Sequence, residues 1–120
     1  MSETKVHGGC MCEDVRYVAS AAPMHTSVCH CRYDRKATGG HVVGWVTFPK
    51  DKFAFVRGKP AEYRSSPPVI RTFCPRCGTS LTYWNAKRAD VIDVTTGSTD
   101  NPQDFPPQEQ VHLEDKLPWV

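Results

Sequence analysis

The chain has 120 residues, with 15 Lys and Arg against 13 Asp and Glu, for a formal net charge of +2. This length suits one domain and excludes two ordinary ones. The charges interleave without a basic stripe, so we expect neither nucleic acid nor an anionic membrane as a partner. No apolar stretch reaches bilayer length and the first residues lack a signal-peptide pattern, so a cytoplasmic location is predicted.

Short apolar, β-branched and aromatic clusters recur along the chain, each bounded by turn-forming or charged residues. This pattern predicts a mostly β fold of short strands in a single domain over residues 1–120. In chain order, we expect strands at Val15–Ala19 and Thr26–Cys29, a helix at Arg32–Thr38 ended by Gly39 and Gly40, then strands at Val42–Phe48, Phe53–Val56, Val69–Cys74, Leu81–Trp84 and Val91–Thr95. The tail from Asn101 holds four prolines and is predicted to be irregular, pinned by Phe105 and Trp119.

The six cysteines form three close pairs, which in a reducing compartment favour metal binding over disulfides. Cys74-Pro75-Arg76-Cys77-Gly78 has the form of a zinc knuckle, because its tight turn aims two thiolates at one point and Gly78 can take a left-handed conformation. One knuckle supplies half a tetrahedron, and Cys10 and Cys12 can supply the other half. The predicted structural zinc site is therefore Cys10, Cys12, Cys74 and Cys77. The alternative is a set of buried, unligated thiols that behave as small apolar residues.

The middle pair, Cys29 and Cys31, is followed at a spacing of three by Asp34. Two thiolates and a carboxylate could hold a second zinc with its fourth position open, as catalytic sites do. A carboxylate is a harder donor than a thiolate, so this site would bind zinc less tightly than three cysteines would. The alternative remains open that Asp34 is a helix-surface charge paired with Arg35 or Lys36, with Cys29 and Cys31 as free thiols. A third hypothesis is a redox-sensing protein that uses these two thiols.

The histidines and tryptophans are not predicted to bind a metal or a cofactor. His30 lies between two cysteines and is predicted to point away from any metal they share. Four further histidines have no partner at metal-ligand spacing, namely His7, His25, His41 and His112. The tryptophans are expected in the core or in a pocket wall, at positions 45, 84 and 119.

Taken in order, the motifs resemble those of the glutathione-dependent formaldehyde-activating enzymes, whose domain also occurs in centromere protein V. The resemblance runs from Gly9 to about Trp119. It is carried by Gly9-Cys10-Met11-Cys12, Val15-Arg16-Tyr17, Cys29-His30-Cys31, Arg35-Lys36-Ala37-Thr38-Gly39, Phe73-Cys74-Pro75-Arg76-Cys77-Gly78-Thr79 with Leu81, and Gly97-Ser98-Thr99-Asp100-Asn101-Pro102.

This resemblance implies an Mss4-like fold, in which several coiled antiparallel β-sheets accompany a zinc-ribbon element. It also implies a structural zinc on the outer four cysteines and a catalytic zinc on a C-H-C-x-x-C motif. Cys29 and Cys31 match that motif, whereas Asp34 replaces its third cysteine. A second departure is Glu13, which stands where the family usually has a glycine.

The activity implied by the resemblance is the condensation of formaldehyde with glutathione to S-(hydroxymethyl)glutathione, or its reverse. The leading hypothesis is thus a zinc-dependent carbon–sulfur lyase with Cys29, Cys31 and Asp34 as catalytic residues and glutathione as co-substrate. Three basic residues near this motif could attract glutathione's carboxylates, although solvated surface charge is the simpler interpretation of Arg32, Arg35 and Lys36. The alternative is a non-catalytic, zinc-stabilised binding module that has lost the second metal site.

Overall fold

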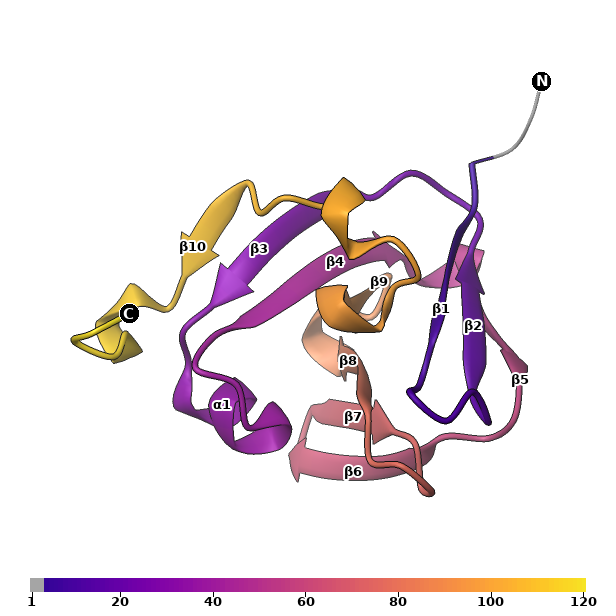
Figure 1. Cartoon of the computed structure of the whole chain (residues 1–120), viewed down its shortest axis with the longest axis horizontal. Coiled ribbons are helices and arrows are strands. Elements are labelled where there is room, and N and C mark those ends of the chain that lie inside the picture. The colour runs from indigo at the N-terminus through magenta and orange to yellow at the C-terminus, as the bar shows by residue number, and fades with distance from the viewer. Residues whose placement is uncertain (1–3) are drawn as a thin grey trace.

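The computed structural model describes residues 4–120, which form short strands, one α-helix and several 3-10 turns (Figure 1). The strands are β1 (Val6–Gly9), β2 (Arg16–Ala19), β3 (His25–Cys29), β4 (Val43–Pro49), β5 (Phe53–Arg57), β6 (Ala61–Ser66), β7 (Val69–Phe73), β8 (Ser80–Asn85), β9 (Val91–Thr95) and β10 (Glu109–Val111). The helix is α1 (Arg32–Thr38). The 3-10 turns are η1 (Lys50–Lys52), η2 (Ala86–Arg88), η3 (Thr96–Ser98), η4 (Pro102–Asp104) and η5 (Leu113–Asp115). The predicted mostly β class is confirmed.

The strands form two sheets. The smaller has the order β1-β2-β5 and the larger has the order β10-β3-β4-β9-β8-β7-β6. In Figure 1 the small sheet stands at the right of the molecule, while α1 and the β6–β7 end of the large sheet lie in the lower part of the view. All pairings between these strands are antiparallel except that of β10 with β3. That parallel pair was not predicted.

The two faces of the large sheet differ in what they contact. Successive side chains of a strand point to opposite faces, so each strand contributes to both. Val46 and Phe48 of β4 and Val94 of β9 are fully buried in the main core, against Tyr17 and Ala19 of β2. Their neighbours in the sequence, such as Trp45 and Thr47, point the other way. The second face is lined mainly by polar residues, and it is the one that carries the candidate site.

Helix α1 has the predicted bounds and is capped at both ends. The Cys31 sulfur at its N-cap accepts a hydrogen bond from the Asp34 amide, and Gly39 ends the helix at a φ of 81°. The Gly39 N–H donates to the Arg35 carbonyl at 2.7 Å. A left-handed C-terminal residue satisfies carbonyls that the last turn leaves free, and glycine adopts that conformation without a Cβ penalty.

The tail differs from the sequence-based expectation. The prediction of an irregular tail is wrong at Glu109–Val111, which pairs with β3 as a strand. This pairing places the tail beside the polar face of the large sheet. Phe105 packs against the main core as predicted. Trp119 does not, because 65% of its surface is exposed and its ring packs against that of His41, with centroids 4.6 Å apart.

Two further strands, β1 and β6, were also missed. Half of β1 is glycine, and β6 is an exposed edge strand rich in polar residues, so neither shows an apolar alternation. Within residues 4–120, no helix is long and apolar enough to cross a membrane.

Candidate functional site

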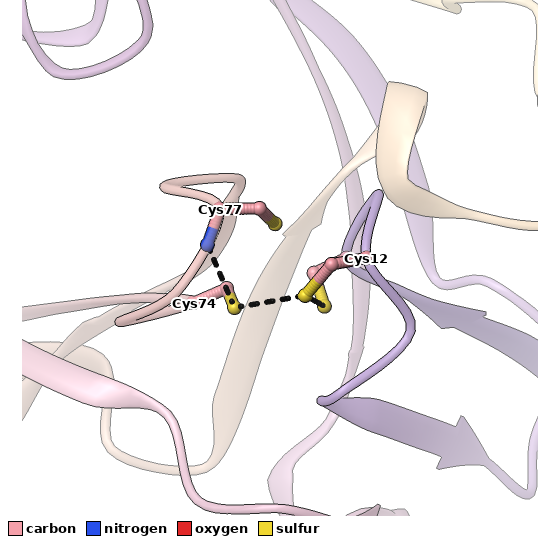
Figure 2. Close-up of side chains that lie close together, drawn as sticks. Cys12, Cys74 and Cys77 are labelled. Carbon is pink, nitrogen blue, oxygen red and sulfur yellow. Dashed lines mark hydrogen bonds between the residues drawn. The ribbon is translucent and has the colours of Figure 1, made fainter.

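Four cysteines meet between two hairpin loops. Cys10 and Cys12 lie in the loop between β1 and β2, whereas Cys74 and Cys77 lie in the loop between β7 and β8 (Figure 2). The Cys12 sulfur is 3.6 Å from that of Cys10 and 3.7 Å from that of Cys74, and all four sulfurs lie within 4.8 Å of one another. Tetrahedral zinc with Zn–S bonds of about 2.3 Å places its sulfurs about 3.8 Å apart. The donor set therefore fits a zinc ion.

Backbone amides surround this quartet and supply partners for negative sulfur. The Val15 amide donates to Cys10 at 3.2 Å, and the amides of Arg76 and Cys77 donate to Cys74 at 3.3 and 3.4 Å. Such donors around metal ligands fix their orientation and stabilise the thiolate, which is the form that binds metal.

The thiols of the quartet cannot all ionise without a cation. Hydrogen bonds from Thr79 lower the pKa of Cys77 to about 5. At Cys12 a backbone bond from Asp14 acts in the same direction, but burial and the three neighbouring thiols outweigh it and raise the pKa to about 12. A divalent cation at the centre would relieve this repulsion.

Both loops depend on left-handed backbone positions. Gly78 has a φ of 83°, as the knuckle motif predicts. Glu13 has a φ of 67°, and its N–H donates to the Cys10 carbonyl at 3.1 Å. Because few side chains adopt this conformation readily, the structure explains why glycine suits the position that Glu13 occupies.

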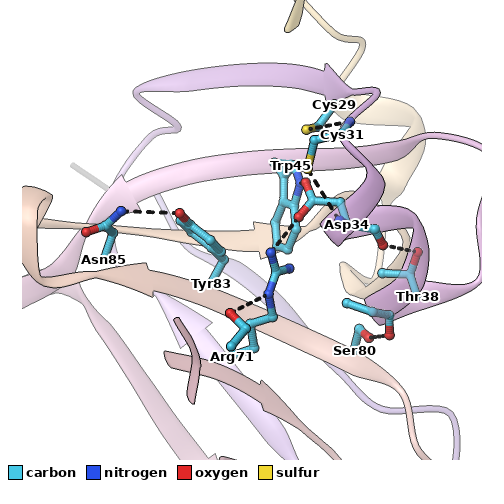
Figure 3. Close-up of polar contacts among 11 residues, drawn as sticks. Cys29, Cys31, Asp34, Thr38, Trp45, Arg71, Ser80, Tyr83 and Asn85 are labelled. Atoms are coloured by element: carbon cyan, nitrogen blue, oxygen red, sulfur yellow. Dashed lines mark hydrogen bonds and ion pairs between the residues drawn. The ribbon is translucent and has the colours of Figure 1, made fainter. Parts of the chain in front are cut away.

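A second cluster forms where β3 passes into α1. The sulfurs of Cys29 and Cys31 and one carboxylate oxygen of Asp34 lie within 4.8 Å of one another (Figure 3). Cys29 is 4% exposed and Asp34 is 5% exposed. Burial raises the pKa of Cys29, and the adjacent Asp34 acts in the same direction, so this thiol stays protonated until a cation stabilises its thiolate.

Asp34 is not a helix-surface charge, and the alternative that paired it with Arg35 or Lys36 is wrong. Its Oδ1 lies 2.9 Å from Nη2 of Arg71 on β7, and its Oδ2 accepts a hydrogen bond of 2.8 Å from the Trp45 indole (Figure 3). The first turn of a short helix turns this side chain inward, toward the polar face of the large sheet. Both carboxylate oxygens therefore have partners before any metal is considered.

One basic residue of α1 makes hydrogen bonds within the protein, and the other two are exposed to solvent. The Arg35 guanidinium donates to the carbonyls of His30 and Asp115, at 2.5 and 2.9 Å, and so holds the helix to the tail. Arg32 and Lys36 are exposed, as the simpler interpretation predicted. Arg35 is thus a partly buried structural residue rather than a solvated charge.

The second cluster opens into a cavity of about 640 Å³. Residues that pair across the strands, and therefore share a face, line it: Ser27 with Trp45, and Thr47 with Asp93. Further lining comes from α1, the β6–β7 hairpin, β8, η2 and the tail, through Tyr33, Ser65, Ser66, Val69, Arg71, Tyr83, Arg88, Glu109, Val111, His112 and Asp115. Most of the residues that line the cavity are polar or charged.

Arg71, Tyr83 and Asp93 line the cavity but were not predicted from the sequence as site residues. Asp93 stands between the buried Ile92 and Val94, and a charged residue in an apolar strand was the available signal that this strand has a polar face. Burial raises the pKa of Asp93, and a hydrogen bond from the Thr47 hydroxyl opposes this only partly.

His30 lies outside both clusters, as expected. It is buried, and its Nε2 lies 2.8 Å from Oε1 of Gln110 on β10. Within the described part of the chain, neither cluster contains a histidine. His25 and His112 instead contact acidic residues of the tail, Glu109 and Glu114.

These features define a small, mostly β protein with one four-cysteine cluster suited to a metal and a second Cys–Cys–Asp cluster in a polar cavity. The family model described as "Glutathione-dependent formaldehyde-activating enzyme" matches residues 5–115, and the chain belongs to this family. The comparison with curated proteins gave no match.

Among solved structures, the chain is similar to a crystal structure of a Rhodobacter sphaeroides protein from a structural genomics programme. The TM-score is 0.69 at 18% identity, and the match covers 88% of this chain and 99% of that one. At this identity the likeness establishes the shared fold alone.

Proposed function

We propose that the protein is a zinc-dependent carbon–sulfur lyase that acts on the glutathione adduct of formaldehyde or of another small aldehyde. The observation that carries this proposal is the meeting of Cys29, Cys31 and Asp34 within 4.8 Å on a cavity wall, in a chain of this family. Two sulfurs and one carboxylate oxygen are donors that zinc accepts, and they would leave one position open.

The charges of the second cluster also suit a divalent ion. Two thiolates and the Asp34 carboxylate carry three negative charges, while Arg71 carries one positive charge. Zinc would bring the sum to zero, which lowers the cost of burying these charges. When bound there, zinc would supply Lewis-acid polarisation of an oxygen or lower the pKa of a thiol.

For the addition reaction, the protein must bind two reactants and transfer one proton. Addition forms a bond between the thiol sulfur and the aldehyde carbon, opens the C=O double bond and transfers the thiol proton to the oxygen; the lyase direction reverses each change. Asp93 is the cavity carboxyl whose pKa burial raises, which suits it to carry that proton. The cavity walls would hold the remainder of the glutathione adduct.

The test must separate catalysis from uncatalysed addition of thiols to formaldehyde. We would measure the exchange rate between free formaldehyde and its glutathione adduct by NMR exchange spectroscopy at fixed reactant concentrations. Zinc-loaded protein should raise the rate in proportion to its concentration, and Cys31→Ser should abolish the increase while keeping the zinc of the quartet. Val56→Ala, on exposed β5 outside the cavity, is the matched control. Equal rates with and without the wild-type protein would contradict the proposal.

One observation favours the alternative of a binding module without chemistry. Both oxygens of Asp34 already have partners, in Arg71 and Trp45, so the cluster is stable as a polar network without a metal. Elemental analysis of protein saturated with zinc separates the two functions: about two zinc ions per chain favour the lyase, and about one favours the module.

A further inference from the structure

The second cluster contains a feature that its ligand motif does not explain. Arg71 reaches from β7 to Asp34, at a distance of 2.9 Å, although the strand and the helix are far apart in the sequence. Its side chain is 12% exposed and that of Asp34 is 7% exposed. A guanidinium stays protonated at any physiological pH, so this site always contains one fixed positive charge.

Zinc and the Arg71 guanidinium are both cations, and they would compete for the Asp34 carboxylate. Each oxygen of Asp34 has a second lone pair, so ligation is possible while the ion pair persists. However, the guanidinium draws electron density from the carboxylate and repels a divalent ion beside it. Burial strengthens that repulsion, because the effective dielectric constant there is well below that of water.

Arg71 also has partners that do not depend on Asp34. Its Nε donates to the Ser65 hydroxyl at 3.1 Å, and its guanidinium lies over the Tyr83 ring at 5.0 Å from the centroid. The Tyr83 hydroxyl in turn accepts a bond of 3.3 Å from the Asn85 amide (Figure 3). The arginine therefore stays held in the cavity wall even when Asp34 turns to a metal.

We propose that Arg71 is the resident counter-ion of the Cys29–Cys31–Asp34 cluster and competes with zinc for Asp34, so that this site holds its metal much more weakly than the quartet does. The inference rests on the second zinc site of the proposed function. It assigns Arg71 the role of setting metal affinity, through charge, rather than a contact with substrate.

The test is a zinc titration of protein whose quartet is already filled, against a competing chelator of known affinity. Arg71→Met should tighten the second site by about tenfold or more, because it leaves a buried carboxylate that only a cation can neutralise. Arg71→Lys keeps the charge and should remain weak. Arg88→Met removes a charge from the same cavity away from Asp34 and should change the affinity less than about twofold.

Two further measurements keep the test decisive. Arg71→Gln retains a donor for Ser65 and replaces Arg71→Met if the latter does not fold without metal; it should also bind zinc more tightly. Cobalt in place of zinc should give stronger thiolate-to-metal absorption per added equivalent in these variants. If wild type takes up a second zinc and neither neutral variant binds it more tightly, the inference is overturned and the proposed function stands. If no variant takes up a second zinc, both are overturned.

Discussion

Replacing Asp34 with cysteine restores the third cysteine of the family motif, and the structure predicts that this substitution destabilises the protein. The Asp34 carboxylate has two buried partners: it forms an ion pair with the Arg71 guanidinium and accepts a hydrogen bond from the Trp45 indole. Removing one partner of a buried ion pair costs about 3–5 kcal/mol, and leaving the indole N–H unsatisfied adds about 1 kcal/mol. Ser65 and Tyr83 still hold Arg71, so we expect a net loss of about 3 kcal/mol.

Denaturant unfolding of protein with one zinc equivalent per chain measures this loss. The double variant Asp34→Cys/Arg71→Met removes the uncompensated charge along with the carboxylate, so it should recover about 2 kcal/mol relative to the sum of the single variants. It should also bind a second zinc more tightly than Asp34→Cys alone, although three cysteines are present in both. If Asp34→Cys is as stable as wild type, or if the two substitutions are additive, the account of Asp34 and Arg71 as a coupled pair is refuted.

Three further outcomes are expected. Cys77→Ser should remove about one zinc per chain and abolish the cooperative thermal transition, because metal and folding energies are shared; a variant that keeps both would refute the quartet as a metal site. Glu13→Gly should leave the free energy of unfolding within about 1 kcal/mol of wild type or raise it, whereas Glu13→Val should lower it by more than about 1 kcal/mol, since β-branched residues strongly resist a positive φ. Burial raises the folded-state pKa of Asp93, so the contribution of this carboxyl to stability falls as pH rises from its unfolded-state pKa toward its folded-state pKa. Asp93→Asn should therefore stabilise the protein at neutral pH, with a gain that disappears in acid. Equal free energies of unfolding for variant and wild type across this pH range would contradict the prediction.

The parts of this fold that the sequence predicts are those set by local signals. The bounds of α1 follow from Gly39 and from the N-cap at Cys31, and the quartet follows from cysteine spacing. Strand β4 was predicted because a strand that is buried on both faces has a long, mostly apolar sequence.

The remainder depends on tertiary contacts that no local signal specifies. Arg71 is an arginine in a strand, and nothing near it in sequence shows that its partner is Asp34. Strand β10 is three residues long with two exposed, so its pairing with β3 follows from the position of β3 rather than from its own composition. Glu13 adopts the left-handed conformation because the quartet loop requires it, against the preference of its side chain.

The division of the large sheet into two faces bears on how this protein could acquire new substrates. Positions such as 46, 48 and 94 maintain the core, while positions 45, 47 and 93 on the same strands face the cavity. Variation confined to the second set alters what the pocket recognises while the residues that carry most of the folding energy stay unchanged. A combinatorial library built at the cavity-facing positions would thus sample ligand preference with the main core intact, and its main cost in stability would come at Trp45, which is 7% exposed and donates to Asp34. The same interleaving would allow natural descendants of this sequence to diverge in specificity one residue at a time without passing through unfolded intermediates.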